Sequence, residues 1–217
     1  MILKGRQVNH KMKVERFVTG IISTNCYLAI NEETRQAVVI DPAASPSYLM
    51  KHIRSEGLKI EAILLTHGHF DHMMGIDGFL AEYDVPVYVH EDDEDVMNQP
   101  ELNLSSTYTS GYTFSGAHYM KDNQVLTYAG YDFQVIHTPG HTRGGCCYYV
   151  ESEGVLFSGD TLFQNSVGRT DFQNSSTSDL IRSIREKLML LPDDTHVYPG
   201  HMGETTIGHE RKYNPYI

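Results

Sequence analysis

The chain has 217 residues, of which 40% are hydrophobic and 21% charged, a balance typical of one soluble globular domain. Its formal net charge of −11 argues against a surface that binds nucleic acid or an anionic membrane, because such polyanions would be repelled at long range. No run reaches the ~18 apolar residues of a transmembrane helix, and no secretory signal is recognisable, so we expect a cytoplasmic protein.

Strand patterns dominate the first half of the chain. Residues 1–11 are polar and without pattern, so we expect a loose extension followed by a single domain over residues 12–217. The predicted strands are Lys13–Val18, Cys26–Ile30, Ala37–Ile40, Ile60–Leu65 and Val85–Val89. The predicted helices are Ser47–Glu56, a segment from about Met73 to Tyr83, and Glu91–Met97.

The second half combines one long loop with further strands. Asn98–Asp122 is rich in Ser, Thr, Tyr and Gly, and loops of this length are often functional, so we expect it to line a pocket mouth. Ser178–Leu191 carries an apolar stripe at helical spacing. The predicted strands are Gln124–Tyr128, Asp132–His137, Cys146–Val150, Val155–Phe157 and Thr195–Tyr198. Strands with intervening helices in both halves indicate a mixed α/β fold.

Only three cysteines are present, Cys26, Cys146 and Cys147, and none belongs to a CxxC motif. This odd number, with one adjacent pair, makes a poor disulfide framework and fits a reducing compartment. Any metal ion bound by this chain is therefore expected to have nitrogen and oxygen ligands.

The strongest local signal is the segment from His67 to His72, His-Gly-His-Phe-Asp-His, which offers four potential ligands within six residues. They cannot all face one way on a regular helix or strand, but they can converge if the chain turns sharply at Gly68. The segment follows a buried apolar strand, and the carboxyl ends of strands in α/β sheets commonly bind ligands. An accidental histidine-rich loop is the alternative interpretation.

The same pattern recurs three times in simpler form. His141, Asp160 and His201 each directly follow a glycine and lie just beyond an apolar strand. Seven nitrogen and oxygen ligands are too many for one tetrahedral ion and suit two. Two ions about 3.5–4 Å apart can lower the pKa of a bridging water to ~7 and polarise the bond that it attacks. The pattern therefore indicates hydrolysis of a carbonyl or phosphoryl group.

These motifs resemble the metallo-β-lactamase superfamily over nearly all of residues 13–217. The resemblance lies in THGHFDH at 66–72, HTPGHT at 137–142, SGDTLF at 158–163 and VYPGH at 197–201. It implies a four-layer αββα sandwich with two divalent metal ions at one edge, most readily zinc, with iron or manganese as alternatives. It also implies that Asp71 and Asp160 are catalytic, with a hydroxide between the ions as nucleophile. The implied ligands are His67, His69 and His141 for one ion, Asp71, His72 and His201 for the other, and Asp160 for both.

Further segments are similar to short glyoxalase II-like proteins, the hydroxyacylglutathione hydrolase-like metallohydrolases. They are GRTDF at 168–172, TNCYL at 24–28 and NLS at 103–105, whereas Met202-Gly203 departs from the usual Gly-Pro. The resemblance implies hydrolysis of a small-molecule thioester by a monomer or homodimer. We expect no helical C-terminal domain of the kind that completes the glutathione site in full-length glyoxalase II. Arg169 is a candidate to pair with a substrate carboxylate, or else with Asp171.

Other functions remain open at this stage. Persulfide dioxygenases share the fold and the GRTDF segment but use a single iron, which would here be held by His67, His141 and Asp160. Other hydrolytic members act on lactones, β-lactams or other esters. A purely structural zinc site is usually four-coordinate and closed, so seven ligands argue for catalysis. We assign no role to His10, His52, His90, His118 or His209, and expect structural roles for His137 and His196.

Overall fold

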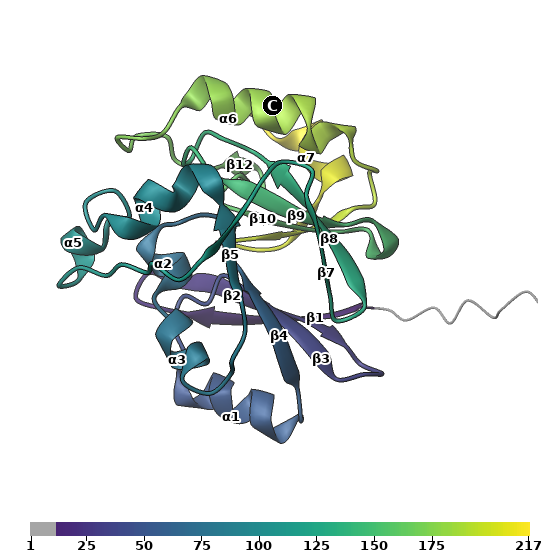
Figure 1. Ribbon diagram of the computed structural model, residues 1–217. Helices are drawn as coiled ribbons and strands as arrows, with labels where there is room; N and C mark the ends of the chain where they lie inside the picture. The colour runs from purple at the N-terminus through teal and green to yellow at the C-terminus, as the bar shows by residue number, and fades with distance from the viewer. Residues whose placement is uncertain (1–11) are drawn as a thin grey trace, which may run out of the picture.

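A computed structural model of the chain describes residues 12–217, so the expected extension at residues 1–11 lies outside the described residues. Two six-stranded sheets lie face to face, with helices on the outer side of each (Figure 1). This is the four-layer αββα arrangement that the resemblance implied. Among the described residues, none of the helices has the length and apolar character needed to cross a membrane.

The first sheet has strand order β1-β2-β3-β4-β5-β6. Antiparallel pairing joins β1, β2 and β3, and parallel pairing joins β3 to β4, β4 to β5 and β5 to β6. Its strands are β1 (Met12–Thr19), β2 (Thr24–Asn31), β3 (Gln36–Ile40), β4 (Lys59–Leu64), β5 (Val87–His90) and β6 (His118–Met120).

The second sheet has strand order β14-β13-β10-β9-β8-β7, and only β10 and β13 are parallel. Its strands are β7 (Val125–Tyr128), β8 (Tyr131–His137), β9 (Cys146–Val150), β10 (Val155–Gly159), β13 (His196–Pro199) and β14 (Thr205–Thr206). A separate small hairpin consists of β11 (Leu162–Phe163) and β12 (Ser166–Val167).

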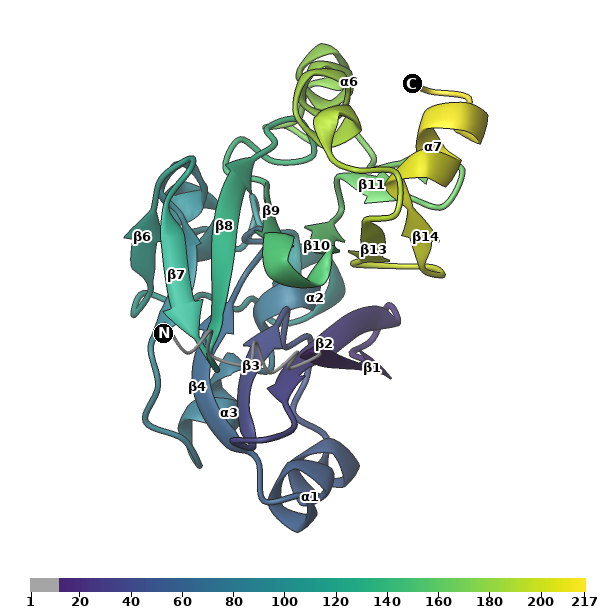
Figure 2. The ribbon, with the colours of Figure 1, turned by 90° about the vertical axis from the view of Figure 1, so that its right-hand side faces the viewer.

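Three hydrophobic clusters hold these layers together. One lies between the sheets and includes Tyr27, Tyr148 and Phe157, all almost fully buried. A second packs the first sheet against α1 (Ser47–Ser55) and α3 (Ile76–Leu80), and a third packs the second sheet against α6 (Thr177–Glu186) and α7 (Ile207–Tyr213). Figure 2 shows α6 and α7 on one outer side of the molecule and α1 on the other.

The structure divides two predicted helices. Instead of one helix over 73–83, it has α2 (Phe70–Met73) and α3, because Gly75 lies against the backbone of Pro42 and Ala44, where a Cβ would collide. The helix predicted to reach Leu191 ends at Glu186, and the 3-10 turn η3 (Leu188–Leu190) follows.

The long loop at 98–122 also has more structure than expected. It contains α5 (Ser105–Tyr108) and edge strand β6. The predicted helix before it consists of the 3-10 turn η1 (Glu91–Asp93) and α4 (Glu94–Asn98). A further 3-10 turn, η2 (Glu151–Glu153), connects β9 to β10.

Candidate metal centre

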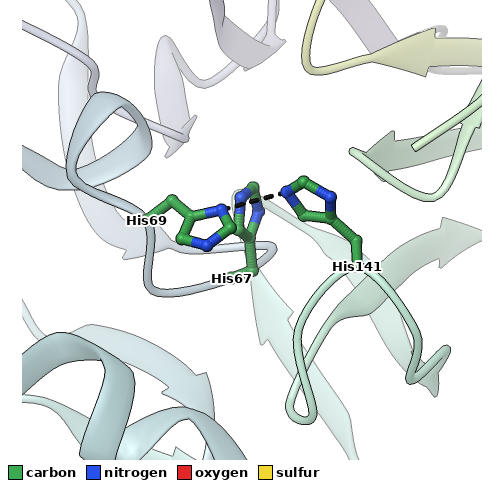
Figure 3. Close-up of side chains that lie close together, drawn as sticks. All are labelled: His67, His69 and His141. Atoms are coloured by element: carbon green, nitrogen blue, oxygen red, sulfur yellow. Dashed lines mark hydrogen bonds between the residues drawn. The ribbon is translucent and has the colours of Figure 1, made fainter. Parts of the chain in front are cut away.

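Seven His and Asp side chains meet where four strands end at one edge of the two sheets. The first four lie just beyond β4 of the first sheet, and the others follow β8, β10 and β13 of the second sheet. Figure 3 shows rings from both sheets converging on a common space. The structure thus brings together all the residues that the sequence motifs singled out, which are His67, His69, Asp71, His72, His141, Asp160 and His201.

Three imidazole rings form a nearly regular triangle. The ring centroids of His67, His69 and His141 are 4.7–4.8 Å apart in every pair. Nδ1 of His69 lies 3.0 Å from Nε2 of His141. A tetrahedral ion bound at about 2.0–2.1 Å separates its ligand atoms by roughly 3.3 Å, so this spacing is close to what a single ion requires.

A second group lies directly beside the first. Nε2 of His72 is 3.4 Å from Oδ2 of Asp71 and 3.4 Å from Oδ1 of Asp160. Nε2 of His201 is 3.2 Å from Oδ2 of Asp71 and 3.6 Å from Oδ2 of Asp160. Oδ2 of Asp160 also lies 3.5 Å from Nε2 of His141, so this carboxylate faces both groups.

Three polar atoms at the centre lack hydrogen-bond partners within the described residues. Within residues 12–217, Nε2 of His67, Nε2 of His72 and Oδ1 of Asp160 are buried without a hydrogen bond. Buried polar atoms without a partner are rare because each costs free energy, and a metal ion is one partner that would satisfy such atoms. The donor set therefore fits divalent metal ions.

The outward-facing nitrogens of these rings have partners that fix the ring orientations. Nδ1 of His141 donates to the carbonyl of Arg169 at 2.8 Å, and Nδ1 of His72 lies 2.9 Å from Oδ2 of Asp41. Asp41 also accepts hydrogen bonds from the backbone and hydroxyl of Thr66. Such outer partners commonly set the tautomer of a metal-binding histidine, leaving its other nitrogen free for the ion. Asp41 was not predicted from the sequence, because it lies outside the ligand motifs.

The electrostatics favour the metal-binding protonation state at His69 and Asp71, whereas at His72 and His201 burial opposes the charged form but the nearby Asp71 carboxylate outweighs it and raises the pKa. The pKa of His69 is lowered to about 3, mainly because the ring is buried and secondly because His141 lies beside it. Burial opposes ionisation of Asp71, but His72 and His201 outweigh it and lower the pKa of Asp71 to about 2. Neutral imidazoles and ionised carboxylates are the forms that act as ligands, so these two side chains need no change of protonation to bind an ion.

Gly200 allows the last ligand loop to approach the centre. A Cβ at this position would collide with Oδ1 of Asp160 and lie 2.7 Å from Cε1 of His72. Any larger residue would therefore displace two of the candidate ligands. This explains why a glycine directly precedes His201.

A cavity of about 250 Å³ opens onto the candidate ligands. Its base includes His69, Asp71, His141, Asp160 and His201, and its walls are mainly apolar. The loop at 98–122 supplies part of the wall, as expected from its length and composition. The apolar wall residues are Ile22, Phe70, Leu104, Tyr108, Phe163 and Phe172.

Arg169 lines this cavity but already has a partner. Its Nε and Nη2 donate to the two carboxylate oxygens of Asp171 at 3.0 and 2.8 Å, and its guanidinium lies 4.8 Å from the centre of the Phe172 ring. Both charged side chains are about two-thirds exposed. The structure therefore contains the Arg169–Asp171 pair that the sequence left open, while binding of a substrate carboxylate stays a prediction.

Met202 stands where the chain departs from the related pattern. Its backbone is left-handed, with φ of 69°, and its side chain is exposed. Its carbonyl accepts a hydrogen bond from Nδ2 of Asn25 at 3.1 Å, and its side chain is not part of the cavity wall described above. The departure therefore lies beside the site and outside the cavity wall.

A smaller cluster of His90, Asp92 and His137 lies behind the site. The two imidazole rings are stacked, with centroids 3.9 Å apart and planes inclined by 10°. Nε2 of His137 also contacts the carbonyl of Arg143 at 2.8 Å. Lone pairs in parallel ring planes do not converge on one ion, so this cluster agrees with a structural role for His137.

Comparison with known proteins gives a consistent assignment. Residues 19–201 match the family model of the metallo-beta-lactamase superfamily. A probable metallo-hydrolase of Bacillus subtilis is 35% identical, over 95% of this chain and 98% of its own length. A hydroxyacylglutathione hydrolase of Haemophilus influenzae is 31% identical, also over 95% of this chain and 98% of its own length.

Solved structures are similar over almost the whole chain. The crystal structure of the B3 metallo-beta-lactamase BLEG-1 is 39% identical, with a TM-score of 0.88, and covers 94% of this chain and 99% of its own. The structure of TTHA1623 in a di-iron-bound form is 33% identical, with a TM-score of 0.84, and covers 94% of this chain and 100% of its own.

Proposed function

The chain belongs to the metallo-β-lactamase superfamily, and we propose that it is a dinuclear metal-dependent hydrolase that cleaves small acyl thioesters. The observation that carries the proposal is the pair of ligand groups joined by Asp160 at the base of an apolar cavity. The similarity to a hydroxyacylglutathione hydrolase and the GRTDF segment support the choice of a thioester.

In this proposal one ion would be held by three imidazoles and the other by one carboxylate and two imidazoles. Asp160 would serve both ions. Bound divalent ions would supply Lewis acidity for the substrate carbonyl and lower the pKa of a nearby water. Zinc suits the nitrogen and oxygen donors, and the di-iron form of a related protein supports iron as the alternative. The proposed ligands are His67, His69 and His141 for the first ion and Asp71, His72 and His201 for the second.

The chain's own residues would then bind and orient the substrate. The apolar wall of the cavity, which includes Leu104 and Phe163, would hold the acyl group and exclude water around the reacting carbon. Asp71 is ionised and lines the cavity, so its carboxylate is placed to accept a proton from the attacking water. A thiolate is a good leaving group, so the reaction does not depend on a strong general acid.

The cavity volume bears on the size of the substrate. A space of about 250 Å³ is small compared with the ~300–1,000 Å³ of pockets that enclose drug-sized ligands. It would hold a small acyl group, while the thiol carrier extends toward the mouth beside Arg169. We propose a small-molecule substrate for these reasons.

Thioester cleavage before and after chelation tests this proposal. The protein would be loaded with zinc or iron and assayed with S-lactoylglutathione and with simpler acyl thioesters. We expect cleavage that is lost on chelation, restored by metal and abolished in His67→Ala. His118→Ala removes an exposed histidine that belongs to none of the ligand motifs, and it serves as the matched control.

Contrary outcomes of this assay separate the alternatives. Oxygen consumption with a persulfide, together with one iron per chain and no thioester cleavage, would replace the hydrolase by a mononuclear dioxygenase. Full activity after complete removal of metal would contradict any metal-dependent mechanism.

A second candidate reaction is hydrolysis of a lactone or β-lactam ring. The structural similarity to BLEG-1, a B3 metallo-beta-lactamase, favours including it. The same ligand groups could act on either carbonyl, but an amide leaving group needs a proton that a thiolate does not. Parallel assays with a chromogenic β-lactam, a lactone and a thioester would rank the three, and we expect the thioester to have the highest kcat/KM.

A further inference from the structure

Asp93 is a fully buried carboxylate close to, but outside, the candidate ligand groups. It lies at the end of η1 and is 0% exposed. Its Oδ2 accepts hydrogen bonds from the backbone N–H of Gly68 and the hydroxyl of Thr142, both at 2.8 Å. Its Oδ1 accepts from the backbone N–H of Gly144 at 2.7 Å. Within residues 12–217 no Lys or Arg forms an ion pair with it, so three neutral donors satisfy this buried charge.

These three donors belong to two ligand loops from different sheets. Gly68 lies between His67 and His69, in the loop that follows β4 of the first sheet. Thr142 directly follows His141, in the loop that follows β8 of the second sheet. Asp93 therefore ties together the two loops that carry all three imidazoles of the first group.

The packing around Asp93 is shaped to allow these bonds. A Cβ at Gly144 would collide with the backbone N of Asp93 and lie 2.7 Å from its Cβ. A Cβ at Gly68 would lie 3.0 Å from Cγ of Met97, on α4. Two glycines thus let the segment formed by η1 and α4 fit tightly between the ligand loops.

Burial of a carboxylate is expensive, which argues for a specific use. Burial raises the pKa of Asp93, although the hydrogen bonds from Gly68, Thr142 and Gly144 oppose this rise. An ionised carboxylate is costly to bury even when hydrogen bonds satisfy its oxygens. Metal ligands must be held within roughly 0.5 Å of their working geometry by surrounding hydrogen bonds.

We propose that Asp93 is a positioning residue for the first metal group, holding His67, His69 and His141 at the separation that one ion requires. This inference rests on the proposed metal-dependent function. Two of the three hydrogen bonds of Asp93 go to the loop of His141, and the third goes to Gly68, between His67 and His69. None reaches the loop of His201, so we expect the first ion to depend on Asp93 more than the second.

The test compares metal affinity in the wild type and in Asp93→Asn, by competition with a chromophoric zinc chelator. The amide NH₂ of Asn would face N–H or O–H donors, so at least one hydrogen bond is lost. We expect the affinity for one of the two ions to fall about 10–100-fold, as is usual when the outer partners of ligands are removed. Asp92→Asn removes the same charge from a half-exposed neighbour and should leave both affinities unchanged.

Unfolding of the metal-free protein in urea separates positioning from simple stabilisation. Asp93→Asn with lower apoprotein stability but unchanged affinity for both ions would overturn the inference. If this variant does not fold, Thr142→Val decides, since it removes a single donor: reduced affinity for one ion supports the inference, and unchanged affinity overturns it. A wild type that binds no metal would overturn the proposed function itself, which is a different result.

Discussion

The two halves of the candidate metal centre differ in burial and in support. In the first half His67, His69 and His141 are all buried, at 2%, 4% and 5% exposure. In the second half Asp71 and His72 are equally buried, and the difference lies in His201, whose side chain is 23% exposed. Asp93 ties the loops of the first half, and none of its bonds reaches the loop of His201.

Strand β2 supports the second half instead. Oγ1 of Thr24 donates to Oδ2 of Asp71 at 2.7 Å. The backbone N–H of Asn25 donates to the carbonyl of Gly200 at 2.7 Å, and its Nδ2 donates to the carbonyl of Pro199 at 2.9 Å. The two halves share the His67–His72 segment but have different hydrogen-bonding supports, so their ions should be separable by mutation of those supports.

Asp160 is shared by both halves, so its removal should have the largest effect. Asp160→Ala removes the carboxylate that both ions would share. We expect the rate of thioester cleavage to fall by about 10⁴-fold, as is usual when one of several catalytic groups that act together is lost. Initial rates and metal content would be measured together. Activity within tenfold of the wild type would mean that the halves act independently.

His201→Ala should affect only the second half. Since the three imidazoles of the first group remain, we expect one bound ion and a loss of activity of about 10²–10³-fold. Elemental analysis with the thioester assay checks this. His196→Ala, which removes a partly exposed histidine that pairs with Glu204, is the control and should keep both ions.

Thr24→Val tests the support of the second half by β2. The variant keeps the shape of the side chain but removes its hydrogen bond to Asp71, so we expect about tenfold weaker binding of one ion. Thr127→Val removes a comparable bond to Asp132 on the surface and should have no effect. Combined with Asp93→Asn, the free-energy changes of metal binding should add, because the two variants weaken different ions. Strong coupling between them would show that the halves share one support.

Arg169→Ala should have the smallest effect. Exposed ion pairs are worth at most about 1 kcal/mol, so we expect KM for anionic thioesters to rise by up to about fivefold with kcat unchanged. The carbonyl that accepts from His141 belongs to the backbone and is retained. Arg143→Ala, which breaks a similar surface pair with Asp95, is the control. An unchanged KM would remove Arg169 from the substrate site.

Much of this arrangement could be predicted from sequence because the signals are local. Each candidate ligand follows an apolar strand, and four of them directly follow a glycine, so their placement at one sheet edge follows from the pattern. Strand β6 was missed because His118–Met120 is only three residues long and buries one side chain, which leaves no alternation to detect.

The supports of the site could not be predicted in the same way. Asp93 lies within five consecutive acidic residues, from Glu91 to Asp95, and nothing in such a run indicates which carboxylate is buried. Thr24 acts on Asp71, which is 47 positions away. Such contacts are made when the two sheets pack together, so they cannot be predicted from the residues next to each ligand.

The number of metal ions per chain tests the central claim most directly. The wild type and His201→Ala would be saturated with zinc, freed of loose metal by gel filtration and measured by elemental analysis. We expect two ions in the wild type and one in the variant. No bound metal in the wild type, or the same number in both proteins, would contradict a centre of two separable halves.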